Sequence, residues 1–190
     1  MSGLYDTEED ARAYIAMAEG YDGRALIDVL KVYLETGSTI LELGTGPGVD
    51  LKILAEDFQV TGSDYSAAFL KILADQNPAF ALLELDAVTL ETDQTFNAVY
   101  SNKVLHHLSA DQLRRSFARQ REIVKDGARL AFHSFWKGEG VQEIKGMKFH
   151  YFEPRNVIDL LGAGWEVVAH DVYEELEPDD SFWLLLRATD

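Results

Sequence analysis

The stretch TILELGTGPGVD, residues 39–50, places a short apolar segment directly before three glycines and the start of a helical pattern. The apolar run at 39–43 is typical of a buried strand. Gly44, Gly46 and Gly48 lack Cβ atoms, so they permit positive φ and allow a ligand to approach the main chain. A helix N-terminus behind such a turn favours a negatively charged group. The stretch therefore predicts a ligand-binding turn after the first strand of an α/β sheet.

Apolar periodicity alternates between strand and helix along the rest of the chain. Strands are expected at 39–43, 58–62, 80–85, 96–101, 128–135, 165–173 and 181–188. Helices are expected at 8–19, 24–35, 49–56, from Ser66 to the Asn77-Pro78 break, from Ser109 to about Lys125, and from Pro154 to about Gly162. Residues 137–148 are expected to form a mobile loop. This order predicts a doubly wound, mostly parallel seven-stranded sheet with helices on both faces, closed by a C-terminal antiparallel hairpin.

Composition narrows the class of protein. The 190 residues predict a single domain, 1–190, with 33 acidic and 17 basic side chains and a formal charge of −16. This charge disfavours nucleic acid and anionic membranes and favours a neutral or cationic small molecule. No cysteine, no secretory leader and no bilayer-length apolar run are visible, so a cytoplasmic protein without a membrane partner is expected. The sequence does not indicate an oligomeric state.

The spacing of the glycines distinguishes between nucleotide-binding turns. The dinucleotide fingerprint G-x-G-x-x-G would need a glycine at Val49, and a phosphate-binding loop would need a lysine there. Asp64 follows Gly44 by twenty residues and is placed to accept hydrogen bonds from a ribose diol. A tight turn with a solvated acid is the simpler alternative. An NAD-dependent oxidoreductase shares the glycine turn and the acid, so it remains an alternative.

Five segments in order resemble the class I S-adenosylmethionine (SAM) dependent methyltransferases, in particular their small-molecule branch. They are ILELGTGPG (40–48), VTGSDYS (60–66), LLELDAV (82–88), FNAVYSNKVLHHL (96–108) and IVKDGARLAFHSFW (123–136). The resemblance covers most of the chain and implies a Rossmann-like methyltransferase fold, SAM as the cofactor, and methylation of a small molecule. A non-catalytic SAM-binding protein on the same fold is a further alternative.

The resemblance also implies roles for individual residues. Glu42, Thr45 and the glycines would surround the methionine part of SAM, and Asp64 would bind its ribose. Tyr65 would be a further cofactor-binding residue. Asp86 would hold the adenine amino group between Leu85 and Ala87. Ser101, Asn102 and Lys103 would face the reacting methyl group.

The candidates for removing a proton from the methyl acceptor lie just beyond the fourth expected strand. His106 and His107 are the candidate catalytic bases, because imidazole titrates near neutrality. The alternative is that one packs on the sheet while the other caps a turn. Neighbouring histidines diverge on a helix, so no metal site is expected. His133 lies within the fifth strand and is expected to be a core residue.

Aromatic residues from two segments are expected at the rim of the site. The N-terminal helices of residues 1–36 would close over it, and residues 137–148 would form a lid. An aromatic cage there would suit a cationic acceptor, although the same side chains could simply cover the edge of the core. The candidate substrate-binding residues are Tyr14, Tyr21, Trp136 and Tyr151, with Tyr5, His150 and Phe152 nearby.

Overall fold

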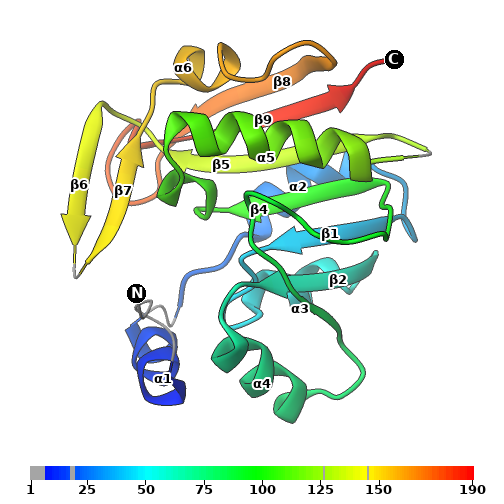
Figure 1. The fold of residues 1–190 in the computed structure, drawn as a ribbon, viewed down its shortest axis with the longest axis vertical. Coiled ribbons are helices and arrows are strands. Elements are labelled where there is room, and N and C mark those ends of the chain that lie inside the picture. Colours follow the sequence, from blue (N-terminus) through cyan, green and yellow to red (C-terminus); the bar gives the residue numbers. More distant parts are fainter. Residues whose placement is uncertain (1–6, 18–19, 126, 145) are drawn as a thin grey trace.

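The computed structural model describes residues 7–17, 20–125, 127–144 and 146–190, and its main feature is a seven-stranded sheet (Figure 1). The strand order is β3-β2-β1-β4-β5-β9-β8. The first five strands in this order run parallel, and β9 runs antiparallel to both of its neighbours. The expected fold class is confirmed. The strands are β1 (Thr39–Leu43), β2 (Gln59–Asp64), β3 (Ala81–Glu84), β4 (Ala98–Asn102), β5 (Leu130–Trp136), β8 (Trp165–Tyr173) and β9 (Ser181–Ala188).

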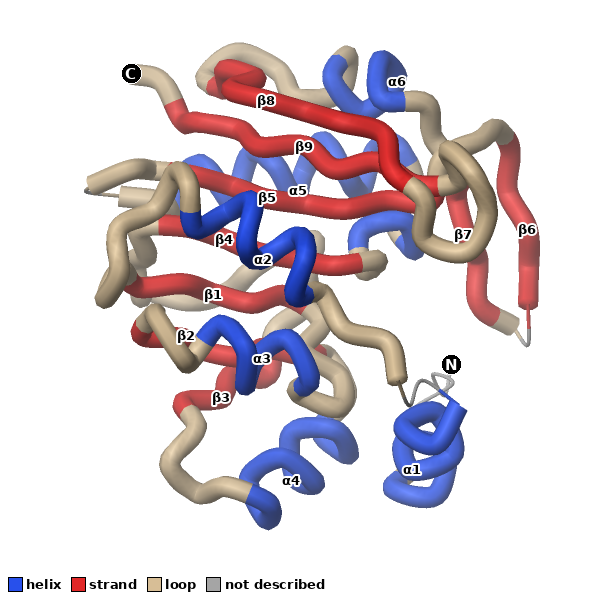
Figure 2. The backbone as a smooth tube through the Cα atoms, turned by 180° about the vertical axis from the view of Figure 1, so that it is seen from behind, coloured by secondary structure: helices blue, strands red, loops and turns tan. Residues whose placement is uncertain are grey.

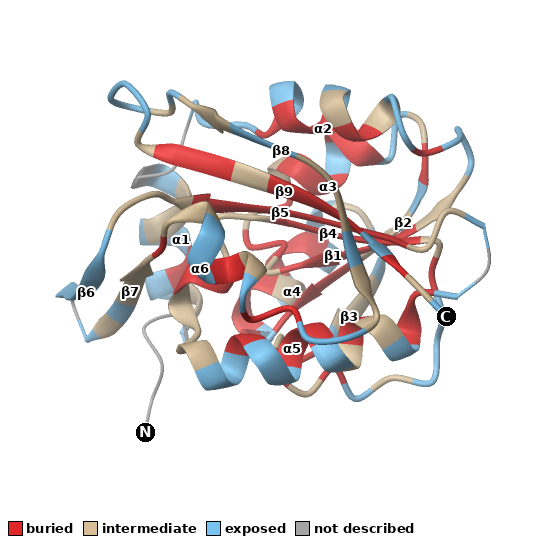
Figure 3. Ribbon diagram, turned by 90° about the horizontal axis from the view of Figure 1, so that it is seen from above, coloured by how far each residue is buried: buried red, intermediate tan, exposed pale blue. Residues whose placement is uncertain are grey.

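Helices cover both faces of the sheet (Figures 2 and 3). Leu113 and Phe117 of α5 and Val157 of α6 belong to the core on one face, whereas Ile27 of α2 and Leu54 of α3 belong to the core on the other. A smaller cluster joins α1 to α4. The helices are α1 (Glu8–Met17), α2 (Arg24–Lys31), α3 (Val49–Leu54), α4 (Ala67–Gln76), α5 (Ala110–Ile123) and α6 (Pro154–Ile158), with the single-turn 3₁₀ helix η1 (Leu105–His107).

The capping residues predicted from the sequence form the expected hydrogen bonds. Ser66 accepts from the Phe69 amide at the start of α4, and Ser109 forms a capping box with Gln112 at the start of α5. Helices α2 and α6 are shorter than expected, since α2 ends at Lys31 rather than near residue 35. Among the described residues, no helix is long and apolar enough to cross a membrane.

Residues 137–148 are not a loop, and that expectation was wrong. Most of the segment belongs to an antiparallel hairpin of β6 (Gly140–Ile144) and β7 (Met147–Tyr151), which forms a separate two-stranded sheet. Every residue of β6 is exposed, so this strand has no buried face and no apolar alternation to reveal it. The hairpin projects from the end of β5 on the side of the molecule where α1 lies (Figure 1).

The strand order indicates where a ligand would bind. The chain leaves β1 toward β2 on one side, whereas β4 lies on the other side of β1. Because the connections diverge there, the carboxyl ends of β1 and β4 border a crevice, where open α/β sheets bind ligands.

Candidate functional site

The glycine turn after β1 leaves no room for a side chain at Gly44 or at Gly48. Gly44, Gly46 and Gly48 all have positive φ, of 63°, 46° and 72°. A Cβ atom on Gly44 would lie 2.6 Å from both methyl carbons of Val104, and one on Gly48 would lie 2.5 Å from a methyl carbon of Leu73. The turn is therefore fixed between η1 and α4 by close packing, and its main chain can be approached by a ligand.

Asp64, at the end of β2, holds this turn in place. Its carboxylate accepts hydrogen bonds from the amides of Gly46 at 3.0 Å and Ser66 at 2.9 Å. Burial raises the pKa of Asp64, and the backbone amides oppose this change by stabilising the carboxylate. Asp64, the acid predicted from the sequence, is thus hydrogen-bonded to the glycine turn.

Two further acids, Glu42 and Asp50, lie close to the turn. Glu42 of β1 is buried and accepts a hydrogen bond of 2.6 Å from Thr45 Oγ1. Asp50 of α3 accepts from the Gly23 amide at 2.7 Å, the Tyr100 hydroxyl at 2.8 Å and Asn102 Nδ2 at 3.1 Å. Burial, with the nearby charge of Asp50, raises the pKa of Glu42 to about 8. Within the described residues, neither acid has an ion-pair partner.

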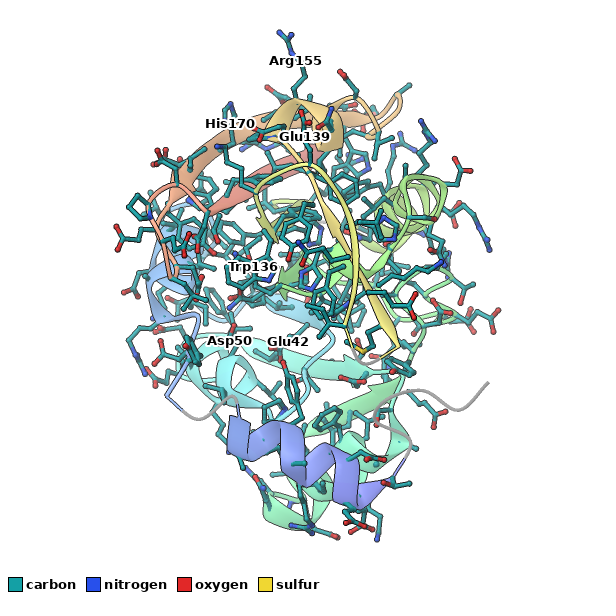
Figure 4. The ribbon with its side chains drawn as sticks, turned by 90° about the vertical axis from the view of Figure 1, so that its left-hand side faces the viewer. Glu42, Asp50, Trp136, Glu139, Arg155 and His170 are labelled. Carbon is teal, nitrogen blue, oxygen red and sulfur yellow. The ribbon has the colours of Figure 1, made fainter. Side chains whose placement is uncertain are left out.

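These acids border a cavity of about 470 Å³ at the carboxyl ends of β1 and β4. Figure 4 faces this side of the molecule, with Glu42, Asp50 and Trp136 in its central part and Arg155 and His170 far from them. The cavity lies between the glycine turn, α1, η1 and the β6–β7 hairpin. Its lining includes Tyr14, Tyr21, Asp22, Glu42, Gly44, Thr45, Asp50, Asn102, Lys103, His106, His107, Trp136, Met147, Phe149 and Glu175.

A larger cavity, of about 600 Å³, lies on the outer side of the same turn. It shares Tyr21, Asp22, Pro47 and Val49 with the first cavity. Its other lining residues come from α1, α3, α4 and Gly20, and it reaches neither Glu42 nor the histidines of η1. The smaller cavity is therefore the candidate site, because the buried polar groups surround it.

The residues expected around adenine form a separate group beyond β2 and β3. The Leu85 amide donates to the Asp64 carbonyl at 3.0 Å, which ties this loop to the end of β2. Asp86 is exposed, and one of its oxygens accepts a hydrogen bond of 2.6 Å from the Val88 amide. Ala87 is half-buried, and Tyr65 is exposed. None of these four side chains, Tyr65, Leu85, Asp86 or Ala87, lines the cavity.

Ser101 does not face the cavity, which corrects the expectation for this residue. It is fully buried, and its hydroxyl lies 2.8 Å from His133 Nδ1. Burial lowers the pKa of His133 to about 3, so its imidazole is neutral. His133 Nε2 in turn lies 2.8 Å from Gln120 Oε1. His133 is a core residue, as expected, and Ser101 is part of its hydrogen-bonded surroundings.

Lys103, directly after β4, occupies the place expected for a cationic acceptor. Its ammonium lies 4.1 Å from the ring centroid of Trp136 and 4.9 Å from that of Tyr173. It also donates to the Phe135 carbonyl at 3.1 Å and to Ser181 Oγ at 2.6 Å. Burial lowers the pKa of Lys103 to about 8, so the charged form still predominates at pH 7. The faces of these two rings therefore hold an internal cation.

The other rim residues fall into two groups. Tyr14 and Tyr21 line the cavity, as does Trp136, whereas Tyr151 does not and has its hydroxyl 3.4 Å from Gln142. Tyr5 lies outside the described residues. Of the two N-terminal helices, α1 reaches the cavity through Tyr14, but α2 packs on the sheet, so closure over the site by α2 was wrong.

His106 and His107 of η1 both line the cavity. Their ring centroids are 4.1 Å apart, and both contact Phe149 of β7. Burial lowers the pKa of each imidazole, and that of His106 falls well below its usual value. In the described part of the chain, no group of three or more side chains could hold a metal ion.

Sequence reasoning missed several residues at this site. Asp50 could have been noticed as an acid in the first turn of the helix behind the glycines. Lys103 was noticed only as part of the segment after β4. Phe149 and Glu175 gave no usable signal, because they reach the cavity from a hairpin that was not expected and from an irregular acidic turn.

Comparison with protein families gives a direct match to the central part of this chain. Residues 40–127, which include the glycine turn, Asp64, Asp86 and both histidines, match the family model described as a methyltransferase domain. A search of curated protein sequences finds no significant match.

Solved structures of methyltransferases share the fold of this chain across nearly its whole length. The glycopeptide N-methyltransferase MtfA with S-adenosylhomocysteine superposes with a TM-score of 0.75 at 16% identity, covering 98% of this chain and 100% of that one. A SAM-dependent methyltransferase from Clostridium acetobutylicum ATCC 824 gives 0.77 at 11% identity, with 96% and 98% covered. The N-methyltransferase NodS from Bradyrhizobium japonicum WM9 gives 0.72 at 15% identity, with 97% and 100% covered.

Proposed function

We propose that this protein transfers a methyl group from SAM to a small molecule that is neutral or cationic. The observation that carries the proposal is the buried Glu42, which has no ion-pair partner among the described residues and lies beside the glycine turn and Asp50. Ionising a buried acid without a nearby cation is costly, which is why the pKa of Glu42 is raised to about 8. The ammonium and sulfonium groups of SAM would supply the missing positive charge. Complexes of MtfA with SAM, S-adenosylhomocysteine and sinefungin support the same assignment by analogy.

The chain's own residues then have distinct tasks. The turn between Gly44 and Gly48 offers space for a ligand beside its main chain, because it carries no side chain at its three glycines. The turn is held by its own hydrogen bonds, since the amides of Thr45, Gly46 and Gly48 donate to Ser63, Asp64 and Thr45. Asp64 offers carboxylate oxygens to the ribose hydroxyls, and Asp86 offers an acceptor to the adenine amino group. SAM supplies an activated methyl group, whose transfer depends largely on alignment and exclusion of water. The apolar walls from Trp136, Met147 and Phe149 would exclude water on the acceptor side.

Calorimetric titration tests the proposal with SAM and with S-adenosylhomocysteine. Saturable binding of both compounds is expected, with one molecule per chain. Titration with NADH addresses the oxidoreductase alternative and is expected to show no binding. A protein that binds neither SAM nor its demethylated product would contradict the proposal. Product formation from labelled SAM separates an enzyme from a protein that only binds SAM.

Asp64→Ala is expected to weaken binding of both SAM and S-adenosylhomocysteine. Hydrogen bonds to a charged carboxylate contribute roughly 1.5–3 kcal/mol each, so the dissociation constants should rise about 10- to 100-fold. The measurement is calorimetry at constant pH. Asp93→Ala removes an exposed acid from the loop after β3 and should leave both constants unchanged. Equal effects of the two substitutions would argue against a ribose contact at Asp64.

A further inference from the structure

The two histidines of η1 differ in how their rings are oriented. His107 Nδ1 lies 3.0 Å from the main-chain carbonyl oxygen of Lys148 in β7. A carbonyl oxygen can only accept a hydrogen bond, so Nδ1 must carry a proton. Burial lowers the pKa of His107, and the ring is neutral at pH 7 with one proton. The lone pair of the imidazole is therefore on Nε2.

His106 has no comparable partner. Its side chain is buried, and neither ring nitrogen has a hydrogen bond to any described residue. Its ring stacks on Phe149 at 5.2 Å, so its surroundings are apolar on that side. His107, in contrast, is half-buried and lines the cavity, and no described residue donates to its Nε2. Only His107 combines a fixed tautomer with access to the cavity.

We propose that His107 Nε2 is the general base of this site, oriented by the Lys148 carbonyl, and that the acceptor's nucleophile carries a proton at neutral pH. The acceptor is then a small molecule with a hydroxyl or a protonated amine. This inference rests on the proposed methyl transfer. A base whose other nitrogen is held by a fixed acceptor is a recurrent arrangement in proton-transfer sites.

The chemical step balances without an additional reactant. The acceptor's oxygen or nitrogen forms a bond to the methyl carbon as the carbon–sulfur bond of the sulfonium breaks. The sulfur leaves with the bonding electron pair as a neutral thioether. The proton of a hydroxyl passes to His107 Nε2 as the oxygen attacks, whereas a protonated amine gives its proton to Nε2 first, so that its nitrogen has a lone pair for the attack. Either route gives an imidazolium that later releases the proton to solvent.

This assignment gives the β6–β7 hairpin a role in the reaction. Strand β7 provides the Lys148 carbonyl, and its side chains Met147 and Phe149 line the cavity. Phe149 also contacts the His107 ring edge-on at 4.7 Å. The hairpin thus orients the base through one main-chain hydrogen bond and one aromatic contact, although it pairs with no strand of the main sheet.

The tautomer can be measured without an acceptor. Nitrogen-15 NMR of histidine-labelled protein at pH 7.5 distinguishes protonated from unprotonated ring nitrogens, and His107→Asn identifies the His107 signals by their loss. We expect Nδ1 to be protonated and Nε2 to be unprotonated. A proton on Nε2, alone or in an imidazolium, would overturn the proposal.

Kinetics provide the second test, with labelled SAM and a panel of small amines, phenols and alcohols. His107→Asn retains an N–H donor for the Lys148 carbonyl and removes the lone pair. Its kcat should fall about 10²-fold or more, with unchanged affinity for S-adenosylhomocysteine. The matched control is His170→Asn in β8, which is exposed and far from the cavity (Figure 4), and it should stay within about twofold of the wild type.

Each kinetic outcome has one meaning. Methylation at oxygen or at nitrogen decides which of the two acceptor groups is used. Turnover by His107→Asn within threefold of the wild type would overturn the role of His107. A wild-type protein that binds SAM but methylates no member of the panel would overturn the acceptor class. Failure to bind SAM would instead contradict the proposed function, and the tautomer result would still be valid.

Discussion

Glu42→Gln is expected to stabilise the protein strongly in alkaline solution. The pKa of Glu42 is about 8 in the folded protein because burial and Asp50 disfavour its charge, and its ordinary value is 4.5. Between these two values the unfolded chain loses the proton while the folded protein keeps it. Stability therefore falls as pH rises from 4.5 to 8. The difference corresponds to roughly 5 kcal/mol as an upper bound, since each pKa unit is about 1.4 kcal/mol.

Glutamine removes this cost because it is neutral at every pH and can still accept from Thr45. We expect the free energy of unfolding of the variant to exceed that of the wild type by several kcal/mol at pH 8.5, and by little at pH 4.5. Urea unfolding at both pH values measures this. Glu84→Gln, in an exposed position of β3, is the control and should show no difference. A variant that is less stable than the wild type at pH 8.5 would contradict the expectation.

The same substitution separates stability from binding. If Glu42 attracts the cationic groups of SAM, Glu42→Gln should bind SAM more weakly despite its greater stability. For the wild type, SAM affinity should increase as pH rises toward 8, because the carboxylate then becomes available. The variant should lack this pH dependence. A gain in stability at the expense of function is common for residues of binding sites.

The parts of the fold that could be predicted are those with strong local signals. The glycines after β1, the capping residues Ser66 and Ser109, and the buried strands each follow from short-range physical preferences. Parallel pairing then follows from the alternation of strands and helices. The β6–β7 hairpin could not be found in this way, because β6 is exposed over its whole length.

The site residues that could be predicted are those whose position follows from the strand on which they lie. Asp64 and Glu42 lie at strand positions that lead into the glycine turn. The surroundings of Lys103 and Ser101 were harder to predict, because their partners are far away in the sequence. The Lys103 ammonium contacts Ser181 and the ring of Tyr173, and the Ser101 hydroxyl contacts His133. Such pairings become visible only once the strands are placed side by side.

His133→Leu is expected to be among the most destabilising single changes in this protein, because it breaks a buried hydrogen-bond chain. The direction of each bond follows from its partners. His133 Nε2 donates to Gln120 Oε1, so His133 Nδ1 accepts from the Ser101 hydroxyl. Gln120 Nε2 donates to Ser116 Oγ at 3.0 Å, and Ser116 donates to the Ala87 carbonyl at 2.6 Å. The chain connects β4 to the loop beside Asp86.

Leucine fills most of the space of the ring but removes the partner of the Ser101 hydroxyl and of Gln120 Oε1, while Gln120 Nε2 keeps its bond to Ser116. Each buried polar group left unsatisfied costs about 1–3 kcal/mol, so a total loss of about 4 kcal/mol is expected in urea unfolding at pH 7.5. The double variant His133→Leu with Gln120→Leu leaves fewer unsatisfied groups. Its loss should be clearly smaller than the sum of the two single losses. Simple additivity would show that the two side chains are not coupled.

The pH dependence of this variant gives an independent check with the opposite sign to that of Glu42. The pKa of His133 is about 3 in the folded protein, against an ordinary value of 6.5, because burial disfavours the imidazolium. Its contribution to stability is present above pH 6.5 and is lost as pH falls toward 3. The difference between wild type and His133→Leu should therefore narrow from pH 7.5 to pH 4. A constant difference across this range would mean that the His133 ring is not kept neutral by burial.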